Sequence, residues 1–369
     1  MTYVVYALLF ILNLLFGIKR FFLPNNFFRA RRSIFLMILS YIGCFLLIAG
    51  YRNFSGLSSD LVNNEHEYMN LITYDTSIYE PGYVLLMKAG SIFSLDFYSW
   101  RNLIIGIALL MIFIPIFKFS KNPHFVLSFF SSYLIIVSAE QFRNFIGFCV
   151  LTYGLIYYLY SDQKYKRTKF IVITIIAGTI HSLFYIYLVL VLIDKTFSLK
   201  TIHRIIFLVL VFCVFIFINN NSIPGLNILL NILGDSRATI YLSQHTRFGF
   251  AFPMLFHLIN TLLSYLAFKK SKDKSNHVNI YKANLITMIF FPLYMLQTTF
   301  SRISRNLLII NYMTQGDYIV EGRPSANKLG YVLISLIGLF IWFYFSLFYL
   351  TNPEAVFKPF FEDNIFLSI

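Results

Sequence analysis

The chain has 369 residues and a formal net charge of +14, yet only 12% of its residues are charged and 58% are hydrophobic. A soluble globular domain carries about 25% charged residues, so this composition, with a mean hydropathy of +0.70, excludes an ordinary soluble protein. Long uncharged runs approach or exceed the roughly 17–25 residues that a helix needs to cross a bilayer. The sequence therefore predicts an all-α polytopic integral membrane protein, with residues 1–369 as a single integral membrane domain of roughly ten to twelve transmembrane or re-entrant helices.

The first two apolar runs, Thr2–Ile18 and Ile34–Gly50, are predicted to be membrane spans. Lys19 and Arg20 follow the first run, where a signal peptide would have a cleavage site with small residues. We therefore expect the first run to be retained as a helix.

An acid-rich polar segment follows, because Tyr51–Tyr83 carries five of the 16 acids: Asp60, Glu65, Glu67, Asp75 and Glu80. Lys and Arg residues instead cluster in short connections, at 19–32, 118–121, 164–169, 195–204 and 269–274. Basic connections are retained in the cytoplasm, so this pattern places the segments near 51–82 and 219–250 on the extracytoplasmic side. It also explains the positive charge without a nucleic-acid partner.

The number of crossings then constrains two weaker segments. Three firm spans lie between the acid-rich segment and the basic connection at 164–169: Asn102–Phe117, Phe125–Ala139 and Asn144–Tyr160. Tyr83–Phe97 is then expected to be interfacial or re-entrant, and Phe170–Ile193 to turn back as two half-helices with His181 near the turn. The competing explanation is that one basic connection breaks the orientation rule, which is statistical.

The remaining spans are predicted at 202–218, 251–268, 283–299, 303–320 and 329–350. The three cysteines (Cys44, Cys149 and Cys213) lie inside apolar runs and are expected to be packing residues. Neither metal-ligand spacing, nor a Ser-His-Asp arrangement, nor a phosphate-cradling glycine loop is visible. We therefore expect no metal and no cofactor.

Arginines at the outer ends of the predicted spans are the first candidate binding residues. Arg143, beside Gln141, lies in a tight outer turn, and Arg302 lies at the start of a span. Basic residues at an outer boundary run against the orientation rule, and guanidinium groups bind phosphate through two parallel hydrogen bonds. Together with Arg52 they predict an anion-binding site.

Glu80 and His181 are the first candidates for acid–base chemistry. Glu80 precedes Pro81 at a predicted helix start, where its carboxylate is either a simple cap or a functional group held by the helix end. His181 lies deep in an apolar run, where an ionisable group is either functional or bonded to a neighbouring helix. Both alternatives stay open for each residue.

Six segments together resemble one family: "YRNFSG", "EPGYVLLMK", "EQFRNFIGFCVLTYGLIYYL", "IAGTIHSLFYIYL", "FSRISRNLLIIN" and "NPEAVFKPF". Their order, from about Gly50 onward, is similar to the EpsG-like branch of the Wzy-type bacterial polysaccharide polymerases. The chain departs from the usual pattern twice. Extra residues separate Gly56 from Asp60 in the Arg-x-x-x-Gly-x-Asp motif, which puts the role of Asp60 in doubt, and Asn144 replaces the usual Gln after Arg143.

The resemblance implies a multi-pass glycosyltransferase of the bacterial cytoplasmic (inner) membrane. Such an enzyme joins undecaprenyl-diphosphate-linked oligosaccharide repeat units at the outer face of the membrane, into O-antigen, capsule or exopolysaccharide. Its expected partners are this lipid-linked oligosaccharide, the lipid bilayer and a chain-length regulator protein.

The resemblance also implies roles for particular residues. The departing diphosphate needs cations, for which Arg52, Arg143, Arg302 and Arg247 are suited, with Gln141 nearby. The acceptor hydroxyl needs a base, for which Glu80 comes first, then Asp60, then His181. Tyr68 and Tyr83 are expected either to stack on sugar rings or to pack in the core.

Two other functions compete with polymerisation. A flippase of the same lipid-linked sugars also needs arginines, but such transporters have related halves and charges at the bilayer midplane, and no internal repeat is visible here. A membrane acyltransferase that decorates glycans needs a histidine or arginine-rich acyl-handling motif early in the chain, and no motif of that type precedes Arg52.

Overall fold

The computed structural model describes residues 1–23, 31–54, 59–193, 198–223, 247–271, 274–349 and 351–368. Within these ranges the regular secondary structure is helical, apart from one isolated antiparallel bridge between Tyr51 and Asn364. Gly56 and most of the predicted outer segment 219–250 lie outside the described residues. By contacts, the chain divides into two compact units, one of 1–188 with 312–369 and one of 189–311. The single integral domain expected from the sequence stays a prediction.

Eight stretches of helix among the described residues are long and apolar enough to cross a membrane. The prediction of an all-α polytopic membrane protein is therefore confirmed. The stretches are α1 (Thr2–Phe22), α2 (Arg31–Gly50), α5 (Phe97–Phe119), the combined α6–η1–α7 (Pro123–Glu140), α8 (Phe142–Tyr160), α10 (Leu199–Ile218), α13 (Ala251–Lys270) and α18 (Ala326–Phe348).

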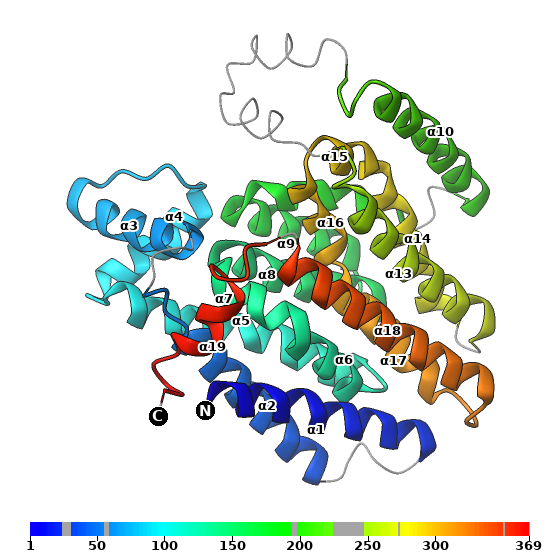
Figure 1. The fold of residues 1–369 in the computed structure, drawn as a ribbon, viewed down its shortest axis with the longest axis horizontal. Helices are drawn as coiled ribbons and strands as arrows, with labels where there is room; N and C mark the ends of the chain where they lie inside the picture. Colours follow the sequence, from blue (N-terminus) through cyan, green and yellow to red (C-terminus); the bar gives the residue numbers. More distant parts are fainter. Residues whose placement is uncertain are drawn as a thin grey trace. The chain divides into compact units, whose positions relative to one another are not determined.

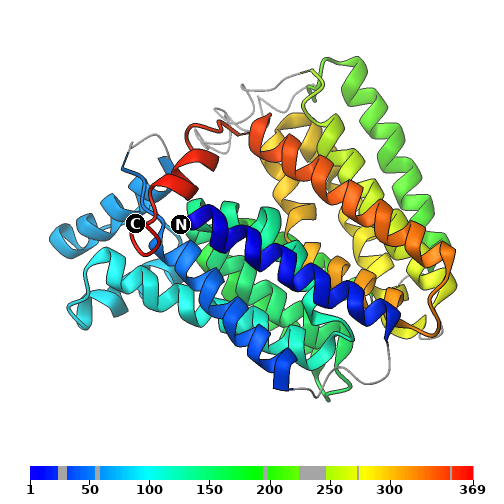
Figure 2. The ribbon, with the colours of Figure 1, turned by 60° about the horizontal axis from the view of Figure 1, so that its bottom comes forward.

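The combined helix Pro123–Glu140 forms the centre of the first unit, since its whole span is buried. Proline at its first position suits a helix start, and a π-helical turn, Phe130–Leu134, interrupts the α-helix without ending it. α1 packs along α6 and α2, as both ribbon views show (Figure 1, Figure 2). α5 packs against α8 in the same unit.

The acid-rich segment forms two short helices, α3 (Ser59–Tyr74) and α4 (Pro81–Ile92). At 1.5 Å per residue the 12 residues of α4 extend about 18 Å, too little for a hydrocarbon core about 30 Å thick. This length agrees with the prediction that Tyr83–Phe97 is not a full span.

α8 and α9 (Lys166–Ile180) form a helical hairpin. Because the connection 161–165 is short, the two helices are antiparallel neighbours, and the end of α9 returns to the start of α8. The helix breaks at His181, whose backbone is extended (φ −150°, ψ 118°), and continues as the 3-10 helix η2 (Ser182–Ile193). The break lies where the sequence predicted the turn, whereas the orientation of this segment in a bilayer stays a prediction.

A carboxy-terminal segment packs on the ends of α1 and α2. α19 (Phe357–Glu362) stacks Phe361 on Tyr3 with ring centroids 4.2 Å apart. Asn364 donates hydrogen bonds to the carbonyls of Leu46 and Leu47 at 3.2 and 3.1 Å. These contacts bring the two termini together, as Figures 1 and 2 show.

The second unit contains α10, α13, α14 (Lys274–Thr287), η3 (Met288–Phe290), α15 (Phe291–Leu296), η4 (Thr298–Ser301) and α16 (Arg302–Arg305), and ends within α17 (Leu308–Val320). The spans predicted at 283–299 and 303–320 are interrupted helices in the structure, and their crossing of the membrane stays a prediction. The helix tightens to a 3-10 turn just before Pro292, and Gln297 is extended (φ −155°, ψ 124°). A further turn at 306–307 separates α16 from α17.

Candidate active site

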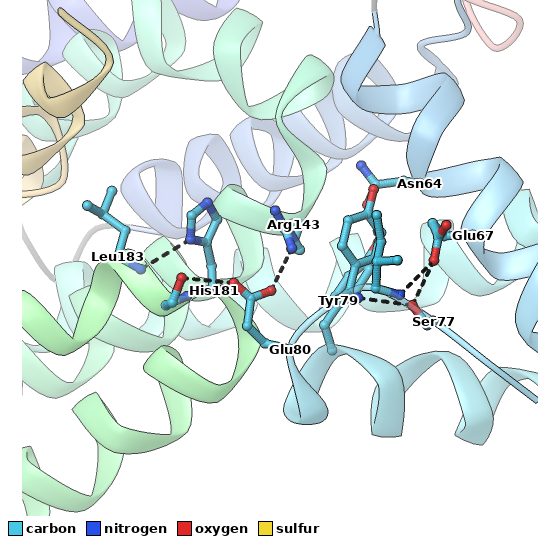
Figure 3. A network of polar contacts seen from close by, with 11 residues as sticks. Asn64, Glu67, Ser77, Tyr79, Glu80, Arg143, His181 and Leu183 are labelled. Atoms are coloured by element: carbon cyan, nitrogen blue, oxygen red, sulfur yellow. Dashed lines mark hydrogen bonds and ion pairs between the residues drawn. The ribbon is translucent and has the colours of Figure 1, made fainter. Parts of the chain in front are cut away.

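Three separate segments bring a carboxylate, a guanidinium and an imidazole together (Figure 3). Glu80 is the residue before α4, Arg143 lies in the first turn of α8, and His181 lies at the break after α9. Arg143 Nη1 donates to Glu80 Oε2 at 2.5 Å. The Ser182 backbone N–H and its hydroxyl both donate to Glu80 Oε1 at 3.0 Å. The sequence predicted Glu80, Arg143 and His181 as separate site residues, and the fold places them in one cluster.

Gly82 allows this close approach. A Cβ at Gly82 would lie 2.3 Å from Thr179 Oγ1 and 2.8 Å from the Thr179 carbonyl oxygen, both well inside van der Waals contact. Since Pro81 fixes the first turn of α4, the start of this helix can touch the end of α9 only if residue 82 has no side chain. This contact between α4 and α9 positions Glu80 within hydrogen-bonding distance of Ser182.

The surroundings of Glu80 favour its ionised form. Partial burial raises the pKa of the carboxyl group, but the Ser182 N–H and the positive charge of Arg143 outweigh it and hold the pKa below the ordinary value of 4.5. The side chains of Glu80 and Arg143 are 22% and 24% exposed, so the pair is accessible from one side. A charged pair that remains accessible is suited to bind a polar ligand.

The Arg143 guanidinium is oriented from a second direction by Tyr79, whose ring centroid lies 4.2 Å from the guanidinium carbon. Burial raises the pKa of the Tyr79 hydroxyl to about 12, so this ring stays neutral. The loop that carries Tyr79 is ordered by Glu67, which accepts hydrogen bonds from the Ser77 hydroxyl and the Ile78 N–H (Figure 3).

The hydrogen bond to His181 indicates its tautomer. His181 Nδ1 accepts from the Leu183 N–H at 3.3 Å, so in the neutral ring the proton resides on Nε2. An imidazole in this state offers an N–H donor at Nε2, which suits an oxyanion better than a hydroxyl that must lose a proton. Its assignment as a base stays a prediction.

Arg52 is 7% exposed and is bound to the end of a helix. Its Nη1 donates to the carbonyls of Ala49 and Tyr51 at 2.8 and 2.9 Å, and its guanidinium lies 3.8 Å from the Tyr98 ring centroid. Burial lowers the pKa of this guanidinium, although it remains a cation. The structure thus gives Arg52 a role in capping α2, and its contact with diphosphate stays a prediction.

Arg101 is a residue that the sequence reasoning missed. It is fully buried and donates to four backbone carbonyls: Ile48 and Ala139 at 3.0 Å, Tyr51 at 3.3 Å and Ala49 at 3.4 Å. It therefore joins the end of α2 to the end of α7, one turn before Arg143. The available signal was a charged residue beside the predicted span Asn102–Phe117.

Tyr68 and Tyr83 lie in an aromatic core around Trp100. Tyr68 is 1% exposed and stacks on Trp100 with centroids 5.0 Å apart, and Tyr83 is 0% exposed and donates its hydroxyl to Asn64 Oδ1. Both rings have packing roles, and sugar stacking by either stays a prediction. Gln141 is the junction between α7 and α8, directly before the turn that carries Arg143.

The other candidates belong to other elements. Asp60 is in the first turn of α3. Arg247 and Arg302 belong to the second unit, where Arg247 is exposed and Arg302 begins α16. In the described ranges no group of three or more His, Cys, Asp or Glu residues could hold a metal ion.

These features define a multi-pass, all-α membrane protein with a charged cluster at the ends of its helices. A model of the EpsG family matches residues 33–361, and the chain therefore belongs to the EpsG family. This family is associated with polysaccharide biosynthesis and glycosyltransferase-like activity. No curated protein and no solved structure matches the chain.

Proposed function

We propose that this protein is a membrane glycosyltransferase that polymerises undecaprenyl-diphosphate-linked oligosaccharide repeat units into a surface polysaccharide. The reaction takes place at the outer face of the bacterial cytoplasmic membrane, in line with the orientation predicted from the basic connections. Membership of the EpsG family supports the class of reaction.

One observation carries the proposal: Glu80, Arg143 and the His181–Ser182 break meet in one accessible cluster. Transfer from a lipid diphosphate requires a cation for the departing oxyanion and a base for the acceptor hydroxyl. Arg143 supplies the cation and Glu80 the base. The imidazole Nε2–H of His181 adds a donor for the diphosphate.

The reaction then needs no cofactor. The acceptor oxygen bonds to the anomeric carbon while the bond from that carbon to the diphosphate oxygen breaks. The electron pair leaves with the diphosphate, and the acceptor proton moves to Glu80. Asp60 is the alternative base.

The test is polymer formation from purified lipid-linked repeats by protein in nanodiscs. Glu80→Gln keeps the size of the side chain but cannot take a proton, and we expect a loss of roughly 10²–10⁴-fold in transfer. If Glu80 is only a cap, the change costs about 1 kcal/mol of stability and leaves transfer within a few-fold of the parent.

A deletion strain distinguishes polymerase from flippase. Surface glycans of a single repeat support a polymerase. Loss of all surface glycan, with lipid-linked repeats accumulated inside the cell, supports a flippase instead.

A further inference from the structure

Both oxygens of the candidate base already accept hydrogen bonds in the structure. Oε1 of Glu80 accepts from the Ser182 N–H and hydroxyl, and Oε2 accepts from Arg143 at 2.5 Å. Oε1 thus accepts two hydrogen bonds, whereas Oε2 accepts one and keeps one lone pair beside the positive charge of Arg143, which makes it a weaker base. The same contact also occupies the cation that the departing diphosphate needs.

The two contacts of Glu80 differ in how easily a ligand replaces them. The bond to the Ser182 N–H is made with the backbone at the start of η2, and it lies where α4 meets α9 through Gly82. The bond to Arg143 joins two long side chains that are each more than a fifth exposed. An anionic ligand therefore competes with Glu80 for the Arg143 side chain rather than for the backbone N–H of Ser182.

We infer that the Glu80–Arg143 ion pair is a latch that the lipid diphosphate opens, so that donor binding is what releases the base. This inference rests on the proposed function. A diphosphate carries more negative charge than a carboxylate and offers paired oxygens that match the guanidinium fork. It replaces Glu80 on Arg143, while Ser182 continues to hold Oε1.

The released Oε2 then offers both of its lone pairs to the acceptor hydroxyl. Removing Arg143 also removes one of the influences that lower the pKa of Glu80, so the carboxylate becomes a stronger base at the moment when it is needed. The Ser182 N–H continues to lower this pKa, and partial burial continues to raise it. The order of binding is thus donor first, acceptor second.

The test measures binding of undecaprenyl diphosphate, without sugar, to the full-length protein in nanodiscs. Glu80→Gln removes the competing charge and should tighten binding by about three- to tenfold while transfer is lost. Arg143→Gln should weaken binding. In the double variant the tightening should disappear, because the two residues act as a pair.

Asp75→Asn is the matched control, since this exposed carboxylate of the same segment pairs with Lys88 rather than Arg143. Its affinity for undecaprenyl diphosphate should stay within twofold of the parent. If Glu80→Gln does not fold, Glu80→Asp withdraws the carboxylate from Arg143 by one methylene and predicts the same tightening.

The outcomes separate the latch from the function. Unchanged or weaker binding by Glu80→Gln, with normal binding by the parent, overturns the latch alone. Failure of the parent both to bind undecaprenyl diphosphate and to transfer from lipid-linked repeats overturns the proposed function and the latch together.

Discussion

Gly82→Ala is the sharpest test of how the site is assembled, because it changes none of the charged groups. The new methyl group would lie 2.3 Å from Thr179 Oγ1 and 2.8 Å from the Thr179 carbonyl oxygen. The hydroxyl can rotate but the backbone carbonyl cannot, so α4 must move from α9 by about 0.5–1 Å to restore ordinary contact. Overpacking of this kind costs about 1–3 kcal/mol, and alanine recovers up to about 1 kcal/mol of helix propensity.

We therefore expect Gly82→Ala to fold and to lose activity. The displacement carries Glu80 away from Ser182 and Arg143, whose hydrogen bonds to it are 2.5–3.0 Å long. A misplacement of about 1 Å costs about 10²-fold in rate, so polymer formation should fall by about that factor. The assay is transfer from synthetic lipid-linked repeats, together with the melting temperature of the purified protein.

Gly330→Ala is the matched control, since a Cβ at Gly330 meets nothing within 4 Å. This variant should match the parent in both transfer and melting temperature. Transfer by Gly82→Ala within a few-fold of the parent would show that the contact between α4 and α9 does not set the geometry of the site.

Three further predictions follow from other contacts. Arg101→Lys cannot reach four carbonyls, and each lost charged hydrogen bond costs about 1.5–3 kcal/mol, so it should lower the melting temperature more than Arg143→Lys does. An equal effect would contradict the role of Arg101 in joining α2 to α7. The fold lowers the pKa of Glu80, so the stabilising effect of this carboxylate is complete above the ordinary carboxyl pKa of 4.5 and is lost as the pH falls through the lowered value. The difference in melting temperature between the parent and Glu80→Gln should therefore shrink only in that acidic range. A constant difference would exclude this linkage. The native cysteines are buried and should not react with an impermeant thiol reagent. Asn63→Cys, at an exposed position of α3, should react with this reagent in spheroplasts, and Asp162→Cys should react only after lysis. The reverse pattern would invert the topology.

Much of the site was predictable because it depends on local signals. Pro81 marks a helix start and places Glu80 directly before it. The short connection between α8 and α9 requires an antiparallel pair, which returns His181 to the level of Arg143. The sequence did not show that these residues touch, because the approach depends on Gly82, and glycine alone does not indicate which backbone comes close.

The parts that were missed depend on partners distant in the sequence. Arg101 donates hydrogen bonds to carbonyls more than 30 residues away in the sequence on either side. No pattern within an apolar run predicts which backbone carbonyls will accept these bonds. The burial of Tyr68 and Tyr83 depends on contact with Trp100, and nothing in the sequence of the acid-rich segment indicates that contact. Hydropathy averages also concealed the interruption at Gln297, because the run before it, Met288–Leu296, carries no charge.

The contacts of Asn364 with α2 have a consequence for the order of events during synthesis. The carbonyl of Leu46 receives its bond from a side chain 318 residues downstream. At about 5–20 residues per second, α2 emerges from the ribosome roughly 15–65 s before Asn364 exists. Until then the end of α2 beside Arg52 and Arg101 lacks part of its final bonding, and it must rely on lipid headgroups, water or an insertion factor. Premature termination anywhere before Asp363 would leave that helix end in its nascent state.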